Sequence, residues 1–491
     1  MSSERAASTQ ESQLPGRVPL HESFREITEH VIDVMQRKPG RGYWLLLLLS
    51  LVMMTLGLAA WGTQIIHGLG MTGLMHPMMW AIYIGDYIWW IGIATAGTLT
   101  SAILFLFRAP FRAAFSRAAE GMTCIAILTA GLFPLIHLGR TWRFYWVFPY
   151  PNERHLWVNF RSPLIIDVWV IATYLVLSIV YFWLELLPDA AVVRDRSTGW
   201  KRTIYGMISL GWEGTDRQWK HLLMASTLHA ALLTPVIISM HSITSWDLAL
   251  AIVPDWHYTI FPPYFVTGAI FSGLAMLLTL MIPIRSYFHL ERVITVDRLE
   301  QLAKIIIATS LMVTYSYAVI YFMAWYRGDP IEEVGYLYQF FGGFKVLFWL
   351  FTICNCVFPL TLLFRRLRRN LVWLWILSII INVGMLAERW CIVAAPLARD
   401  YDVYSWAPGT FHVSWVGIGI TIGSLGFFLF SFLIFIKVVP IVPLYELRKD
   451  MLREAREARA ETEAEGLLKA RYEELRIKAI ETQSGAGGSE S

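Results

Sequence analysis

The chain has 491 residues, of which 56% are hydrophobic, 14% aromatic and only 16% charged. Its mean hydropathy of +0.50 excludes an ordinary soluble globular protein and predicts a membrane protein that crosses the bilayer many times. A formal net charge of +4 is too small to indicate a nucleic-acid-binding protein. The four cysteines all lie in apolar segments without a CxxC motif, so no sequence pattern predicts a bound metal, iron–sulfur cluster or covalent haem.

The amino-terminal segment, residues 1–42, is polar and lacks the short apolar core and cleavage site of a signal peptide. Apolar residues recur in it at helical spacing between Phe24 and Met35, which predicts a surface helix; a solvated tail is the alternative. Residues 437–491 form a second polar tail. Acidic and basic residues alternate in it from about Leu444 to Gln483, which predicts a charged helix before a flexible end.

Ten apolar segments follow the first tail, each long enough to cross a hydrocarbon layer of about 30 Å at about 1.5 Å per residue. They lie approximately at residues 43–66, 82–107, 118–138, 163–187, 219–243, 261–283, 302–325, 338–364, 371–394 and 412–436. The sequence therefore predicts an all-α membrane domain of ten helices over residues 43–436.

A weak internal repeat divides this domain. Residues 87–106 and 264–281 both begin with a tyrosine that small residues follow, although small residues are common wherever membrane helices meet. The repeat predicts two four-helix bundles, formed by helices two to five and six to nine. Helices one and ten are then expected at the periphery.

The distribution of basic residues predicts the orientation. The loops on the side of the amino terminus carry more Lys and Arg than the loops on the opposite side. By the positive-inside rule, both termini are expected in the cytoplasm and residues 138–162 outside.

This outer loop is rich in aromatic residues and also carries Arg140, Arg143, Arg154 and Arg161. Aromatic residues alone would be typical of an interfacial belt. Because the arginines run against the orientation rule, we expect them to dock an acidic partner surface.

Four stretches carry a resemblance to a known family: AGTLTSAILFLFR at 96–108, RAAEGMT at 117–123, AGLFPLIHLGRTWRFYWVFPYPN at 130–152, and NFRSPLIIDVW with IATYL at 159–175. In them the chain resembles the NrfD-type, polysulfide-reductase-like membrane subunits that interact with quinols. Within that family it is most similar to the larger such subunit of bacterial alternative complex III. The resemblance covers essentially the whole chain.

The resemblance implies a subunit of the bacterial inner membrane that oxidises a quinol near the periplasmic face, with menaquinol expected rather than ubiquinol. The electrons would pass to iron–sulfur clusters of a periplasmic partner and then to multihaem cytochrome c subunits. A second NrfD-type subunit and small membrane subunits are the other implied partners. This chain itself would bind no haem, iron–sulfur cluster or metal.

The candidate catalytic residues are His137 and Asp167, which the helix boundaries place at similar depth below the outer face. Ser162 and Pro163 predict the N-cap and first residue of the fourth helix. Asp167 is then the fifth residue, beyond the turn in which a cap explains a carboxylate. The resemblance implies that it is a quinone-site carboxylate, and the alternative is an ion pair with Arg161 or Arg140. His137 follows Pro134, which disturbs the helix and allows the ring to turn toward a cavity; the alternative is an interfacial histidine.

Two further residues are candidates for binding the quinone. Asp247 could instead be a first-turn acid of a short helix capped by Thr244 or Ser245. Arg389 lies below the membrane interface and needs an anion or a cavity, and simple pairing with Glu388 is the alternative.

Polar residues farther inside the membrane predict a candidate proton path, although each could only bridge two helices. They are Glu185, His229, Lys345, Tyr315, Tyr317 and Tyr321.

Quinol oxidation is thus the leading hypothesis. An anchor or proton-conducting subunit without quinol chemistry is the second. A secondary transporter is disfavoured because the sequence lacks a matched pair of Gly/Pro-interrupted helices.

Overall fold

The computed structural model describes residues 20–74, 78–148, 155, 159–398, 412–449 and 452–453. Its regular elements are all helices. Arg154 and most of the carboxy-terminal charged segment lie outside these residues, so the predictions about them stay predictions. The expected amino-terminal surface helix forms as α2 (Leu20–Gln36).

Ten helical segments are long and apolar enough to cross a membrane, as the sequence predicted. They are α3 (Arg41–His67), α4 through α5 (Ile82–Leu106), α6 (Ser116–His137), α7 (Pro163–Asp195), α9 (Asp216–Ala249), α10 (Phe261–Tyr287), α11 (Val296–Arg327), α13 through η6 (Lys345–Leu363), α15 (Leu371–Leu397) and α16 (Trp415–Val438). The chain is therefore a multi-span integral membrane protein.

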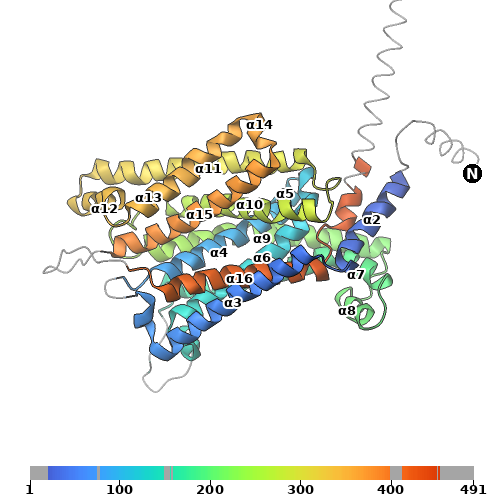
Figure 1. The fold of residues 1–491 in the computed structure, drawn as a ribbon, viewed down its shortest axis with the longest axis horizontal. Coiled ribbons are helices and arrows are strands. Elements are labelled where there is room, and N and C mark those ends of the chain that lie inside the picture. The colour runs from blue at the N-terminus through green and yellow to red at the C-terminus, as the bar shows by residue number, and fades with distance from the viewer. Residues whose placement is uncertain are drawn as a thin grey trace, which may run out of the picture. The chain divides into compact units, whose positions relative to one another are not determined.

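Two four-helix bundles form the centre of this domain (Figure 1). In the first, α4 packs on α6, and α7 packs on α6 and α9; in the second, α10 packs on α11 and α15, and α13 packs on α15. The first helix of each bundle also contacts the last helix of the other, since α4 packs on α15 and α10 on α9. At the α4–α10 contact, a Cβ added to Gly273 would lie 2.4 Å from the Ala96 side chain. Small residues thus let the two bundles approach closely.

The peripheral pair α3 and α16 packs side by side, also through glycines (Figure 1). A Cβ added to Gly57 would lie 2.5 Å from the Cα of Gly423, so a larger residue at either position would separate the helices. Lys437 of α16 donates to the carbonyl oxygens of Val34 and Arg37, at 2.7 and 3.2 Å. A cation at the carboxyl end of α2 satisfies free carbonyl groups and complements the helix dipole.

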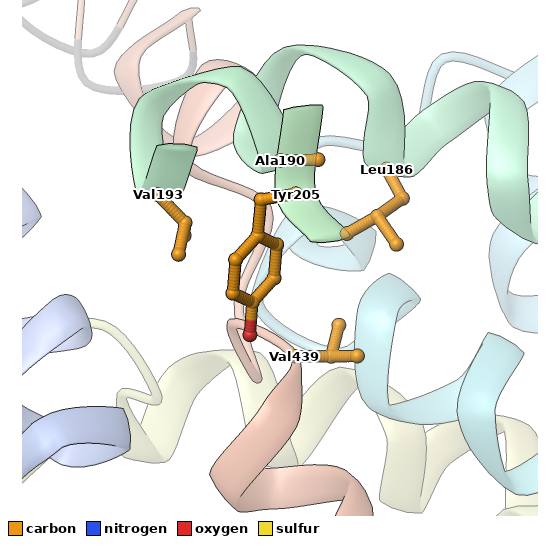
Figure 2. Close-up of a cluster of buried hydrophobic side chains, with 5 residues drawn as sticks. All are labelled: Leu186, Ala190, Val193, Tyr205 and Val439. Carbon is orange, nitrogen blue, oxygen red and sulfur yellow. The ribbon is translucent and has the colours of Figure 1, made fainter. Parts of the chain in front are cut away.

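The end of α16 is also tied to α7 and to the short helix α8 (Trp200–Ile208). Figure 2 shows Tyr205 of α8 between Leu186 and Val193 of α7 and Val439, which follows α16. The Tyr205 hydroxyl donates to the Val438 carbonyl oxygen at 2.5 Å. Burial raises the pKa of the Tyr205 phenol, so the hydroxyl remains a donor at neutral pH.

The predicted start of the eighth membrane helix, at residue 338, was wrong. Its first residues belong to a separate helix, α12 (Pro330–Phe341), and the membrane-spanning segment begins at Lys345. Asp329 caps α12 by accepting from the Ile331 amide at 2.9 Å. The two glycines at 342 and 343, poor helix formers, lie between α12 and α13 and explain the break.

Ser162 and Pro163 occupy the N-cap and first positions of α7, as predicted, although the Ser162 side chain makes no capping hydrogen bond. Helices α6, α7 and α9 extend beyond the apolar segments of the sequence. Polar residues assigned to loops, such as Arg117, therefore lie inside helices.

Candidate functional site

Asp167 is buried near the beginning of α7. Tyr87 of α4 donates a short hydrogen bond to its Oδ2 atom, and Thr244 of α9 donates to Oδ1 at 2.8 Å. Hydroxyl groups, rather than Arg140 or Arg161, thus satisfy this carboxyl group, and the ion-pair alternative is not what the structure shows. Three helices of the first bundle meet at one carboxyl group.

Asp247 completes this group. Helix α9 runs without a break from Asp216 to Ala249, so the alternative of a short helix capped by Thr244 is wrong. The carboxyl groups of Asp167 and Asp247 lie within hydrogen-bonding reach of each other. Asp247 Oδ1 is buried and has no hydrogen-bond partner among the described residues. We call Tyr87, Asp167, Thr244 and Asp247 the Asp167 centre. Two neighbouring carboxyl groups favour a shared proton because like charges repel.

His137 is the last residue of α6. Gln64 of α3 donates to the neighbouring Ile136 carbonyl oxygen at 2.7 Å, and Tyr83 of α4 donates to Gln64 Oε1 at 2.8 Å. This end of α6 is therefore held from two sides. The Nδ1 atom of His137 is buried without a hydrogen-bond partner in the described part of the chain, and Asp167 accepts from other residues. A buried imidazole nitrogen without a partner is suited to bind a polar ligand.

A second buried carboxyl group, which the sequence interpretation considered only as a partner of Arg389, lies in the second bundle. Glu388 of α15 has no exposed surface. Its oxygens accept from the hydroxyl groups of Tyr264, by a short bond, and Tyr317 at 2.5 Å, and from Asn355 Nδ2 at 3.0 Å. We call these four residues the Glu388 centre. The feature of the sequence that could have revealed this centre is Tyr264. It begins the second repeat, as Tyr87 begins the first.

Arg389 lies beside this second centre. Its guanidinium carbon is 4.4 Å from the centroid of the Phe265 ring, and Nη1 is 3.5 Å from Glu388 Oε1. Nη1 has no hydrogen-bond partner among the described residues. Pairing with Glu388 is therefore loose, because that carboxylate is already bound by three other donors.

Asp86, next to Tyr87 on α4, is a further buried carboxyl group that the sequence interpretation missed. It accepts from Trp390 Nε1 at 2.8 Å and from the Thr421 hydroxyl at 2.6 Å. The contacts join α4, α15 and α16, so Asp86 connects both bundles to the peripheral pair. The sequence could have revealed Asp86, because it is an acidic residue within the apolar run 82–98.

The residues expected along a proton path lie at several separate places in the described part of the chain. Tyr317 belongs to the Glu388 centre, and Tyr321 donates to Gln339 of α12 at 3.1 Å. Tyr315 is 65% exposed. Lys345 is exposed at the first position of α13, not deep in the membrane, because helix eight begins later than predicted.

The other two residues of the predicted proton path, His229 and Glu185, lie in the first bundle. His229 of α9 is 2.9 Å from the Leu177 carbonyl oxygen and stacks on Tyr181 of α7, so it bridges these helices. Glu185 of α7 is half-buried, and its backbone oxygen accepts from Arg117 at 2.7 Å.

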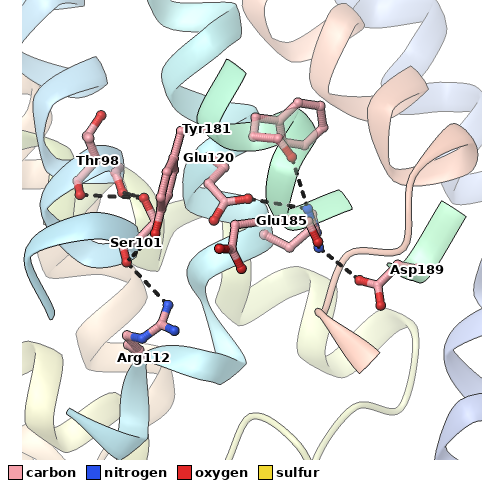
Figure 3. Close-up of polar contacts among 10 residues, drawn as sticks. Thr98, Ser101, Arg112, Glu120, Tyr181, Glu185 and Asp189 are labelled. Atoms are coloured by element: carbon pink, nitrogen blue, oxygen red, sulfur yellow. Dashed lines mark hydrogen bonds and ion pairs between the residues drawn. The ribbon is translucent and has the colours of Figure 1, made fainter. Parts of the chain in front are cut away.

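Arg117 forms a buried ionic network with Glu120 and Asp189, which Figure 3 shows near Glu185. Its guanidinium group has no exposed surface and binds Asp189 Oδ2 at 2.8 Å and Glu120 Oε2 at 3.4 Å. The sequence assigned Arg117 to an inner loop. It instead joins α6 to α7 at the end of the first bundle that is opposite the Asp167 centre.

The outer-loop arginines differ in exposure. Arg140 and Arg161 are exposed, whereas the half-buried Arg143 lies over the Trp146 ring, 4.7 Å from its centroid. Trp142 and Trp146 of the same loop are 60% and 50% exposed. Cations and large aromatic side chains thus share this surface.

Within the described ranges, no group of three or more His, Cys, Asp and Glu side chains is arranged to hold a metal ion. Residues 70–399, which run from before α4 to the end of α15, match the family model described as polysulphide reductase, NrfD. The chain is 29% identical over 412 residues to a dimethyl sulfoxide reductase membrane subunit of Halobacterium salinarum, a match that covers 79% of this chain and 88% of the relative. It is 22% identical over 402 residues to a selenate reductase subunit of Mesobacillus selenatarsenatis, covering 76% and 89%. The family match includes both carboxyl centres and leaves α3 and α16 outside.

Proposed function

Since the chain belongs to the polysulphide reductase NrfD family, we propose that it is the quinol-oxidising membrane subunit of a respiratory complex of the alternative complex III type. The observation that carries this proposal is the Asp167 centre, a buried carboxyl pair at one end of the first bundle. The relatives are named as subunits of reductases, which supports the role of a subunit within a larger complex.

We assign two buried polar atoms that have no hydrogen-bond partner among the described residues to the head group of a quinol: Nδ1 of His137 and Oδ1 of Asp247. In the proposed reaction a quinol, with menaquinol expected, loses two electrons and two protons. His137 binds one ring oxygen, and Asp167, with Asp247 beside it, accepts a proton. Tyr87 and Thr244 orient the carboxyl group. The electrons leave through iron–sulfur clusters of a partner subunit, and haem subunits receive them next.

Arg389 stays a predicted quinone-binding residue. It lies beside Phe265 and Glu388. Its buried Nη1 atom has no hydrogen-bond partner among the described residues.

Replacing His137 with Phe tests the quinol site directly. The ring is kept, but both nitrogens are lost, so we expect at least about tenfold less quinone to copurify with the complex, as for the loss of a hydrogen bond of about 1.5 kcal/mol in a buried site. His229→Phe is the matched control, because His229 bridges α7 and α9 and should leave quinone content unchanged. Quinone is extracted from the purified complex and quantified. Unchanged quinone content in the assembled His137 variant would favour the alternative, an anchor without quinol chemistry.

We infer that the chain lies in a bacterial inner membrane with both termini in the cytoplasm, because the basic loops then lie inside. Exposed residues on the two faces can serve as labelling probes. A cysteine at Glu333 of α12 should react with an impermeant maleimide in intact spheroplasts. A cysteine at Lys201 of α8 should react only after lysis. The chain with its own cysteines is the control, and the reverse labelling pattern would invert the orientation.

The exposed arginines of the outer loop support a docking surface for an acidic iron–sulfur partner. Replacing Arg140 and Arg161 together with Glu exchanges attraction for repulsion, which can cost several kcal/mol at a complementary interface. We expect the variant to insert normally but to lose its partner on mild detergent extraction, with loss of quinol-dependent haem reduction. Lys201→Glu with Arg202→Glu makes the same charge change on the opposite face and should retain the partner. Retention of the partner by the Arg140/Arg161 variant at the native haem reduction rate would remove this loop as the docking surface.

A further inference from the structure

The two carboxyl centres lie on either side of a single helix crossing. At this crossing, a Cβ added to Gly85 of α4 would lie 2.6 Å from the Trp390 ring and 3.3 Å from the backbone carbon of Arg389. Tyr87, two residues after Gly85, binds Asp167, and Glu388 directly precedes Arg389. The Asp167 centre and the Glu388 centre are therefore neighbours at similar depth, although they belong to different bundles.

His241 of α9 lies at this contact between the bundles. It precedes Thr244 of the Asp167 centre by three residues, so the two side chains share one face of the helix. Its side chain is 1% exposed, and its ring approaches the Ile91 carbonyl oxygen of α4. Neither ring nitrogen forms a hydrogen bond with a described residue.

Arg389 approaches the same place from α15. It interacts electrostatically with His241, and a Cβ added to Gly268 of α10 would lie 2.6 Å from its Nη2 atom. The absence of a side chain at Gly268 thus makes room for the guanidinium group. Nη1, which also lacks a hydrogen-bond partner in the described part of the chain, is 3.5 Å from Glu388 Oε1.

These unsatisfied atoms have complementary chemistry. Arginine can only donate hydrogen bonds, whereas a neutral histidine has one donor and one acceptor nitrogen. A buried polar group without a partner costs about 1–3 kcal/mol, and buried water commonly removes that cost. A water molecule can accept from Arg389 and donate to His241, which satisfies both side chains at once.

We propose that His241 and Arg389 bind water between the bundles, and that this hydrated link carries a proton from Asp167 to Glu388. The proposal rests on the proposed function, because the proton is one of the two released by the quinol. It leaves the Asp167 carboxyl group, crosses His241 and the bound water, and joins the Glu388 carboxylate. Three donors, the hydroxyl groups of Tyr264 and Tyr317 and the Asn355 amide nitrogen, hold this carboxyl group in place. His241 is thus a proton-transfer residue, and Glu388 is a second proton-binding site of the complex.

Infrared difference spectroscopy on the intact complex tests this link, because the carbonyl stretch of a carboxyl group reports its protonation. Spectra are recorded as quinol is oxidised, and Asp167→Asn and Glu388→Gln assign the two bands. We expect both bands to respond in the unaltered complex. In His241→Phe the Glu388 response should be at least about tenfold slower, as for the loss of a proton-transfer group, while the Asp167 response stays. His241→Gln keeps a donor and an acceptor and should restore most of the Glu388 response.

Gly268→Ala provides an independent variant that leaves His241 in place. The added methyl group displaces the Arg389 guanidinium and should slow the Glu388 response as well. An unchanged Glu388 response in His241→Phe, or a Glu388 band that is silent in the unaltered complex, would overturn the link while the quinol site stands. A silent Asp167 band would overturn the quinol site and the link with it.

Discussion

Quinol oxidation should fall at least about tenfold in Asp167→Asn, the range expected for loss of a positioned general base. The carboxamide has nearly the size of the carboxylate and still offers one oxygen to Tyr87 or Thr244, so the three helices remain joined. Its nitrogen cannot accept the proton of the quinol. Steady-state oxidation of a soluble quinol analogue by the purified complex measures the loss, and gel filtration checks that the complex is assembled.

Asp86→Asn is the matched control for this experiment. Asp86 is a buried carboxyl group one residue from Tyr87, but Trp390 and Thr421 satisfy it at the helix contacts. Its replacement should lower stability by about 1–3 kcal/mol, because one donor loses its acceptor, and should leave the turnover of assembled complex near the native rate. If Asp167→Asn retains the native rate, Asp167 is not the proton acceptor.

The largest loss of stability is expected for Arg117→Met. The variant removes the buried cation that binds Asp189 and Glu120 (Figure 3). Removal of one member of a buried ion pair typically costs about 3–5 kcal/mol, because the remaining charge is uncompensated. We expect little folded protein in the membrane and a clearly lower temperature of heat-induced aggregation in detergent.

A triple variant tests whether the loss of stability comes from the uncompensated charges or from lost contacts. Arg117→Met combined with Asp189→Asn and Glu120→Gln removes all three charges and should recover most of the lost stability. Recovery would show that the uncompensated carboxylates caused the loss. If the triple variant is as unstable as Arg117→Met, the hydrogen bonds from Arg117 to the α7 backbone are the main contribution instead.

The buried carboxyl groups of the two bundles have related surroundings. In each bundle, the tyrosine that begins the repeat donates to a carboxyl group on a later helix: Tyr87 to Asp167, and Tyr264 to Glu388. The acids stand on α7 and α15, which are not equivalent helices in the repeat. The equivalent tyrosines, rather than the position of the acid along the chain, are thus what the two halves have in common.

The amino-acid sequence alone was enough to predict the ten membrane helices and their division into two bundles with a peripheral pair, because apolar length and small-residue patterns are local properties. It also indicated Asp167, since a carboxylate five residues into an apolar helix is exceptional. Its boundary for helix eight was wrong, because a window of apolar residues does not register two glycines as a break.

Which polar residues meet became visible only in the folded chain. The sequence placed Arg117 in a loop, but in the structure α6 and α7 enclose it together with Asp189. Glu388 looked like the partner of its neighbour Arg389, yet residues 71 and 124 positions away donate to it. Hydropathy along the chain records how polar a segment is, but a buried polar side chain is satisfied by groups on other helices, and their identity depends on how the bundles pack.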